Sequence, residues 1–368
     1  MISPVKSQRK REVWLDYARV CAILCVILCH AVETYYRPAL IGDKQIAFIP
    51  WLVETLLFTI GRLGVPLFLA ISGTLLLSKE KDIFSFYKRS VLPLLLTTEI
   101  WIIFNYFFAG YAYNREYSVI YFLEQIFFMD SPSLSHTWYM PMIIGVYLFV
   151  PFLAKLLREY DSIKYYAIPL VLVGIGSILV PTLNMFINED LLSDMNRLSF
   201  KVDLAFGGGV YGLYFVLGYF IGRKGLLKKI RTRWLIIVSL LLLAGNTAWQ
   251  YYLYSHGYYD LDDLLWYTSV AVFAAGLSLF EIIRRLKKCL ENWNFSGVAL
   301  MAKCSFGIYL LHKPIMILCE RWIVPDNINL MFKIIMLFCL SFLFSILVLI
   351  PFVLKWRKAG RILFYIKG

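Results

Sequence analysis

The chain alternates between long apolar runs and short polar segments rich in Lys and Arg. An uninterrupted apolar run of about 18 or more residues can cross the hydrocarbon core of a bilayer as a helix. We therefore expect an all-α, polytopic integral membrane protein with about ten transmembrane helices, in which residues 1–368 form a single membrane-embedded domain. The expected spans are residues 12–35, 48–77, 88–109, 137–157, 164–187, 207–222, 233–254, 264–283, 302–322 and 329–354.

The basic residues of the connecting segments predict the orientation of these spans. Segments expected on the same side as the N-terminus hold 27 Lys and Arg residues, and those on the opposite side hold 7. Because Lys and Arg are enriched on the cytoplasmic side, both termini are predicted to be cytoplasmic. The predicted location is the plasma or inner membrane. In the long external loop, the amphipathic stretch Tyr117–Met129 predicts a helix lying at the membrane surface.

Composition and charge indicate which kind of molecule the protein contacts. The net charge is +13, but the basic residues lie in short loops between apolar runs, which fits contact with membrane lipids and argues against nucleic acid. Cys21, Cys25 and Cys29 recur at every fourth position of the first span. A metal or redox stripe is one interpretation. Small apolar packing residues are the interpretation we prefer, because no zinc-finger or CxxC spacing is present.

Charged residues in the first span are the main functional signal, because a charge at the centre of a membrane helix costs about 2.5–3.5 kcal/mol. Arg19 and His30 lie three helical turns apart on one face, about 16 Å from each other along the axis. Asp16 and Glu33 extend the same stripe. Arg19 is suited to a phosphorylated donor, and His30 is suited to deprotonate a hydroxyl, with Glu33 orienting its ring. The alternative is a snorkelling Arg and a His bonded within the bundle.

Arg62 is a second intramembrane charge, beside Gly61, Gly64 and Pro66. Gly and Pro interrupt a membrane helix and turn polar groups toward a cavity. Arg62 is therefore predicted to organise the reacting groups. Pairing with an intramembrane acid, Glu54 or Glu99, is compatible with that function.

Two further His residues are predicted near His30. His136 begins a span at the outer surface, and His312 lies in the middle or outer half of another. Acid–base work, sugar binding and structural hydrogen bonding stay open for them. No metal is expected, because the external loops lack a carboxylate-rich ligand set.

Four residues are candidates for substrate contact. Lys88 and Arg89 can bind donor phosphates or simply set the topology. Trp138 and Tyr139 can stack on a sugar ring or anchor the helix at the interface.

Five motifs follow one another along the chain. They are the stretch from Leu15 to His30, Arg62-Leu-Gly-Val-Pro-Leu-Phe-Leu-Ala-Ile-Ser-Gly73, Phe86-Tyr-Lys-Arg89 with Pro93, His136-Thr-Trp-Tyr139 and Ser305-Phe-Gly-Ile-Tyr-Leu-Leu-His312. In this order the motifs resemble the acyltransferase 3 family of membrane acyltransferases. The second motif departs from the family pattern at Leu69, where a second Phe is common.

The resemblance implies ten helices, a cytoplasmic acyl-CoA donor and acyl transfer to a carbohydrate hydroxyl outside. It implies His30 as the catalytic base and Arg19 as essential for use of the donor. The fourth motif, His136-Thr-Trp-Tyr139, resembles the branch that O-acetylates surface polysaccharides. No extracytoplasmic SGNH-type esterase domain follows the last span, so we expect this chain to complete transfer or to pass the acyl group to a partner.

Residues and resemblance together predict an O-acyltransferase that uses acetyl-CoA or another acyl-CoA. Its expected acceptor is a surface polysaccharide or a lipid-linked glycan. His30, Glu33, Arg62 and His136 are the predicted catalytic residues, and Arg19, Lys88 and Arg89 are the predicted donor-binding residues. Trp138, Tyr139 and His312 are expected to contact substrate. The alternative is an exporter of a glycan, although the paired broken helices of transporter repeats are not found.

Overall fold

The computed structural model describes residues 11–36, 46–186, 198, 208–256, 266–293 and 295–366. These residues form helices and no β-strand, which confirms the all-α prediction. The elements are α1 (Val13–Glu33), α3 (Phe48–Arg62), α4 (Gly64–Leu76), α5 (Ile83–Phe86), η1 (Tyr87–Val91), α6 (Leu92–Tyr113), α7 (Val119–Ile126), η2 (Ser135–Trp138), α8 (Tyr139–Glu159), η3 (Ile163–Tyr166), α9 (Ala167–Gly174), η4 (Ile175–Leu179), α10 (Val180–Asn184), α11 (Gly209–Tyr219), η8 (Phe220–Lys224), α12 (Thr232–Ser255), α14 (Val270–Arg285), α15 (Lys287–Asn292), α16 (Ser296–Trp322), α17 (Leu330–Leu354) and α18 (Arg357–Leu363).

Among the described residues, 7 helical segments are long and apolar enough to cross a membrane, and each overlaps a predicted span. The other three predicted spans fall on α11, α14 and α16. α14 has only 16 residues, and α16 includes Lys303, Lys313, Glu320 and Arg321. The number of ten spans and the cytoplasmic location of both termini therefore stay predictions.

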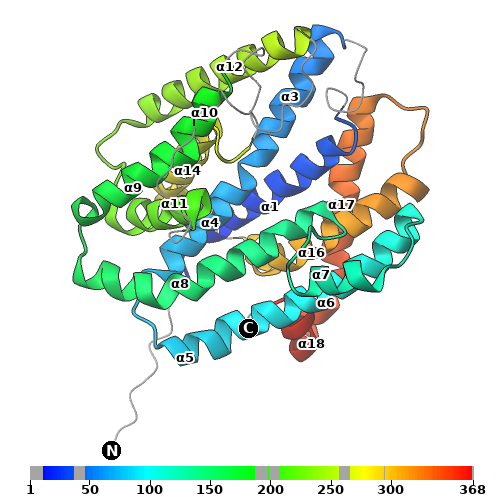
Figure 1. Cartoon of the computed structure of the whole chain (residues 1–368), viewed down its shortest axis with the longest axis horizontal. Helices are drawn as coiled ribbons and strands as arrows, with labels where there is room; N and C mark the ends of the chain where they lie inside the picture. The colour runs from blue at the N-terminus through cyan, green and yellow to red at the C-terminus, as the bar shows by residue number, and fades with distance from the viewer. Residues whose placement is uncertain are drawn as a thin grey trace, which may run out of the picture.

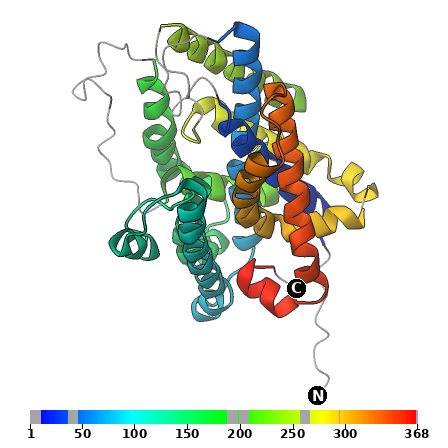
Figure 2. The ribbon, with the colours of Figure 1, turned by 90° about the vertical axis from the view of Figure 1, so that its right-hand side faces the viewer.

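Helix α1 runs through the middle of the bundle, packed against α3, α4, α16 and α17 (Figure 1). In both views α12 lies at one edge, and α5 with α18 lies at the opposite edge (Figures 1 and 2). Ala18, Ala22 and Ile23 of α1 are completely buried. The polar stripe of α1 is consequently held inside the protein, where its charges must find partners or line a cavity.

The second span is broken where the sequence places Gly and Pro, since α3 ends at Arg62 and α4 begins at Gly64. A Cβ atom at Gly61 would lie 2.6 Å from the Cα of Cys29. Glycine therefore lets the break in the second span rest directly on the backbone of α1. Cys25 and Cys29 are buried in the bundle, consistent with the packing interpretation.

Helix α7 confirms that the external stretch Tyr117–Met129 contains a helix. Its apolar side chains Val119 and Ile120 are exposed, as a surface-lying helix requires. Its buried Gln125 accepts hydrogen bonds from the backbone N–H and the hydroxyl of Ser133, both at 2.9 Å. α7 thereby fixes the segment that contains Ser133.

The opposite end of α1 is tied down by an ion pair. Arg223 donates to both carboxylate oxygens of Glu12, at 2.9 and 2.8 Å, and to the carbonyl of Thr74 at 3.0 Å. Burial by itself would raise the pKa of Glu12, but the hydrogen bonds and charge of Arg223 outweigh it and hold that pKa below its ordinary value. Glu12 is therefore ionised at neutral pH and joins the start of α1 to η8 and α4.

Candidate active site

Three histidines from different elements meet in the interior. His30 comes from α1, His136 from η2 and His312 from α16. The ring centroids of His30 and His312 lie 5.1 Å apart, those of His136 and His312 5.0 Å apart, and those of His30 and His136 6.3 Å apart. His136 and His312 are fully enclosed, whereas the side chain of His30 keeps 12% of its surface exposed. The convergence expected from the sequence is present, and we call these residues the histidine cluster.

Glu33 orients His30 through a 2.6 Å contact between its Oε2 atom and Nδ1 of the ring. One turn of helix separates the two residues, so the backbone of α1 sets this geometry. Lys313 of α16 also contacts Oε2 of Glu33, at 3.1 Å. An ionised Glu33 can only accept a hydrogen bond, so Nδ1 of His30 is the donor in this contact, and in the neutral ring Nε2 keeps its lone pair.

Two hydrogen bonds hold His312 in position, one made by its ring and one made to its backbone carbonyl. Its Nδ1 donates to the carbonyl of Tyr309 at 2.5 Å, and Ser341 donates to its carbonyl oxygen at 2.8 Å. Its Nε2 atom is buried and has no hydrogen-bond partner among the described residues. Tyr309 donates its hydroxyl hydrogen to the carbonyl of His136. α16 therefore fixes the ring of His312 and the backbone of His136, and an acceptor nitrogen on His312 stays available inside the cluster.

Arg62 lies beside the cluster, in contact with aromatic rings. Its guanidinium carbon lies 4.6 Å from the ring centroid of Phe58 and 4.7 Å from that of Trp266. Both His30 and Glu33 lie within range of its charge. Stacking on aromatic faces offsets part of the cost of burying this cation. The structure thus brings Arg62 close to the histidine cluster, and its role in catalysis stays a prediction.

A cavity of about 660 Å³ leads from the N-terminal end of α1 toward the histidine cluster. Its mouth is charged, its middle is apolar, and we call it the basic cavity. The charged lining residues are Arg11, Asp16, Arg19, Lys81 and Lys303. Arg19 donates to Asp16 at 2.8 Å, and Arg11 contacts the same carboxylate.

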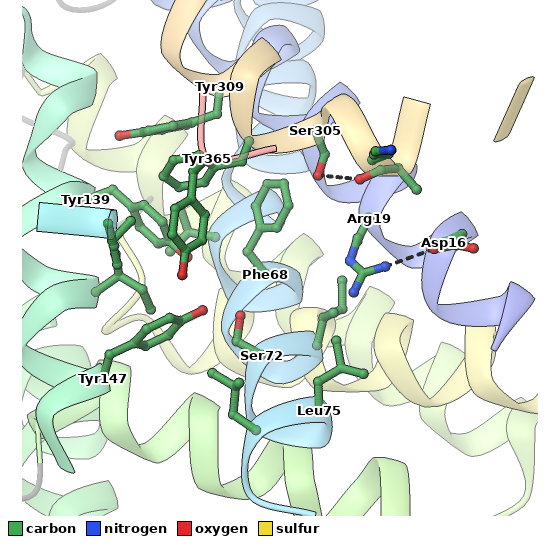
Figure 3. A pocket seen from close by; sticks show the side chains of 18 of the residues that line it. Asp16, Arg19, Phe68, Ser72, Leu75, Tyr139, Tyr147, Ser305, Tyr309 and Tyr365 are labelled. Atoms are coloured by element: carbon green, nitrogen blue, oxygen red, sulfur yellow. Dashed lines mark hydrogen bonds and ion pairs between the residues drawn. The ribbon is translucent and has the colours of Figure 1, made fainter. Parts of the chain in front are cut away.

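Tyrosines close the other end of the basic cavity. Figure 3 shows Tyr139, Tyr147, Tyr309 and Tyr365 on one side, with Arg19 and Asp16 opposite and Phe68 between them. The ring of Tyr309 lies 5.6 Å from that of His136 and 5.9 Å from that of His312. The inner wall of the basic cavity is therefore in contact with the histidine cluster.

A second cavity, of about 730 Å³, lies on the other side of the cluster. It is lined by Glu33 and Lys313, by Arg115, and by the segment 131–135. Four aromatic rings complete it, so we call it the aromatic cavity. These rings belong to Tyr113, Tyr121, Trp138 and Trp266. The two cavities share no lining residue, and the cluster lies between them.

Of the three residues predicted to contact substrate, Trp138 and Tyr139 line different cavities, and His312 lines neither of them. Trp138 lines the aromatic cavity, and Tyr139, the next residue, lines the basic cavity. The turn from η2 to α8 sends adjacent side chains to opposite sides. The interfacial-anchor alternative does not account for rings that face two cavities.

Lys88 and Arg89 are not brought to the basic cavity. Both are exposed in η1, because Phe86 and Tyr87 turn inward toward α8 and leave their neighbours at the surface. The cations that line the cavity mouth instead are Arg11, Lys81 and Lys303. Charge alone could not distinguish these from Lys88 and Arg89, because all lie in basic segments on one side of the predicted membrane.

Lys313 is the main residue that the sequence analysis missed. It follows His312 inside an apolar run, and the cost of an intramembrane charge was the signal that could have found it. Its partner, Glu33, is far away in the sequence, so only the fold shows the contact. Among the described residues, no group of three or more His, Cys, Asp or Glu is arranged to hold a metal ion.

Comparison with known proteins identifies the family of the chain. A model of the acyltransferase 3 family, described as an acyltransferase domain, matches residues 12–353. No curated protein and no solved structure matched the chain. The matched region includes the histidine cluster and nearly all residues of both cavities. The chain therefore belongs to the acyltransferase 3 family of membrane acyltransferases.

Proposed function

We propose that this membrane acyltransferase transfers an acyl group, in the first instance acetyl, from cytoplasmic acyl-CoA to a hydroxyl group of an extracytoplasmic glycan. The proposal rests mainly on the order in which functional groups occur along α1. The basic cavity, the histidine cluster and the aromatic cavity follow one another along the bundle. A donor and an acceptor that approach from opposite sides would meet at His30.

The basic cavity suits a coenzyme A thioester. Its mouth holds four cations, which match the phosphates of the donor. Its apolar middle, with Val26, Phe68 and Leu75, suits a long thin arm that carries the acyl group inward. The positive-inside prediction puts this mouth at the cytoplasm, where acyl-CoA is found.

The aromatic cavity suits a sugar. Tyr and Trp rings offer flat apolar faces for the C–H surface of a pyranose, and Ser131, Ser133 and Ser135 offer hydrogen bonds to its hydroxyls. Its volume of about 730 Å³ is large enough for more than one sugar unit. A polysaccharide end or a lipid-linked glycan is therefore the proposed acceptor.

The proposed reaction is a direct acyl transfer. Nε2 of His30 takes the proton of the acceptor hydroxyl as its oxygen bonds to the thioester carbonyl carbon. The C–S bond then breaks, and the proton passes from His30 to the departing thiolate of coenzyme A. The guanidinium of Arg62 would stabilise the negative charge that develops on the carbonyl oxygen, and the acceptor nitrogen Nε2 of His312 would orient the acceptor through one of its hydroxyl groups.

Glycan export is less well supported. A bulky glycan would have to pass the enclosed rings of His136 and His312, between two cavities that have no lining residue in common. Transfer of a small acyl group needs no such opening.

The test uses inverted membrane vesicles supplied with acetyl-CoA labelled in the acetyl group. Label should enter the glycan fraction with the native protein and fall by about 100-fold or more in His30→Ala, the scale expected for loss of a general base. His256→Ala is the matched control, because His256 is exposed at the end of α12 and lines neither cavity. If no acyl-CoA donates label, yet glycan crosses the membrane only with the protein present, the exporter alternative replaces the proposal.

A further inference from the structure

Lys313 is a buried cation at the boundary between the histidine cluster and the aromatic cavity. Its side chain is 12% exposed, and it lies in α16 directly after His312. Its ammonium group lies 3.1 Å from Oε2 of Glu33 and borders the aromatic cavity. A lysine in this position has lost most of its hydration, so its contact with Glu33 must offset a large desolvation cost.

Glu33 connects Lys313 to His30. Oε2 of Glu33 accepts from both Nζ of Lys313 and Nδ1 of His30, at 3.1 and 2.6 Å. The three side chains therefore form a continuous chain of charge-assisted hydrogen bonds from α16 to α1. The charge of Lys313 also lies within range of the His30 ring, but the hydrogen-bonded route by which Lys313 can orient that ring runs through Glu33.

The charge of Lys313 determines whether Glu33 stays ionised and hydrogen-bonded to His30. Arg62 of α3 and the imidazoles of His136 and His312 also face His30, but Lys313 is the cation in contact with the carboxylate. The Glu33 side chain is 36% exposed and lines the aromatic cavity, so without the contact from Lys313 its carboxylate would turn toward that cavity or acquire a proton. Either change would release Nδ1 of His30, and the neutral ring could then carry its proton on Nε2, the nitrogen needed as base.

We propose that Lys313 is a positioning residue of the transfer reaction, which keeps Glu33 ionised and aimed at Nδ1 of His30 so that Nε2 is the free base. The inference rests on the proposed function for its kinetic consequence. Its structural consequence, the tautomer of His30, can be measured without turnover. Lys313 contacts no reacting atom in this role, and its contribution is made through Glu33.

The kinetic test compares Lys313→Met with Lys313→Arg in purified protein in proteoliposomes. Lys313→Met should lower kcat by about ten-fold or more while KM for acetyl-CoA changes by less than about two-fold, because the donor is bound at the other end of the bundle. Lys313→Arg keeps the charge next to a roomy cavity and should restore most of kcat. Lys333→Met is the matched control, since Lys333 is also ion-paired and only 16% exposed but lines neither cavity.

A double variant separates positioning from packing. In a Glu33→Gln background, Lys313→Met should cause little further loss of kcat, because the residue through which it acts is already altered. If the two losses multiply, or if Lys313→Met lowers only the amount of folded protein and leaves kcat unchanged, the proposal is wrong and Lys313 merely joins α16 to α1.

The tautomer is read directly by ¹⁵N NMR of histidine-labelled protein, with the His30 signals assigned by their absence in His30→Gln. The native protein and Lys313→Arg should show His30 protonated on Nδ1, and Lys313→Met should show a mixture of tautomers. An unchanged His30 spectrum in Lys313→Met overturns the proposal. If no acyl-CoA supports turnover but the spectra change as expected, the proposed function fails and the positioning role of Lys313 stands.

Discussion

At the residue scale, one face of α1 carries the chemistry of both cavities. Arg19 lines the basic cavity, His30 lies in the cluster and Glu33 lines the aromatic cavity. The helical rise of about 1.5 Å per residue spaces these groups over most of a membrane span. A single helix can therefore serve a donor at one end and an acceptor at the other without a change in its conformation.

The cations at the mouth of the basic cavity should matter more than nearby surface cations. Arg19→Ala is expected to raise KM for acyl-CoA by about ten-fold, the scale of one charge-assisted contact to a phosphate. Lys303→Ala should have a smaller effect in the same direction. Lys88→Ala should leave KM almost unchanged, because Lys88 is exposed away from the cavity. Initial rates at varied acetyl-CoA measure all three, and a larger effect from Lys88 than from Lys303 would return Lys88 to the donor site.

At the element scale, close helix crossings hold the cavity walls in position. Gly73 of α4 faces the backbone of α11, where an added Cβ would lie 1.8 Å from the carbonyl oxygen of Phe215. Ser72 and Leu75, on either side of Gly73, line the basic cavity. Small residues allow membrane helices to approach this closely, and backbone atoms cannot move aside as a flexible side chain would.

Gly73→Ala should therefore force α4 and α11 apart. We expect it to destabilise the protein by about 1–3 kcal/mol, the usual cost of overpacking, and to reduce activity through the displaced cavity wall. Gly245→Ala in α12 is the control, because its added Cβ would meet no atom within 4 Å. Thermal unfolding in detergent compares the two, and equal melting temperatures would show that the crossing tolerates a methyl group.

At the scale of the whole molecule, the cavities lie on opposite sides of the histidine cluster. The tyrosines that end the basic cavity pack on the same rings that separate it from the aromatic cavity. A reaction at the cluster would need only the acyl group to cross this boundary. The bundle can therefore act as a fixed partition with a reactive centre.

Cysteine labelling tests whether the cavities face opposite sides of the membrane. In a variant in which the seven native Cys residues are replaced by Ala, Ser135→Cys in the aromatic cavity should react with an impermeant maleimide added to intact cells. Lys81→Cys in the basic cavity should react only in inverted vesicles. Labelling of both positions from the same side would refute the predicted orientation and, with it, a reaction across the membrane.

The sequence by itself determined the membrane class, most of the span positions and the helical stripe of α1. These features depend on local properties, namely hydropathy over a span and the helical repeat, and neither requires knowledge of neighbours. The intramembrane cost of charge also singled out His30, Glu33, Arg62 and His312 before their partners were known. The family motifs could be recognised for the same reason, because each is a short local pattern of residues.

Only the tertiary structure decided which groups touch. It joined Lys313 to Glu33, put Tyr139 and Trp138 in different cavities, and left Lys88 and Arg89 at the surface. Hydropathy cannot rank cations within one basic segment, because membrane orientation requires only that they lie on the correct side. Contacts between residues hundreds of positions apart depend on how helices cross, and that is set by the packing of the whole bundle.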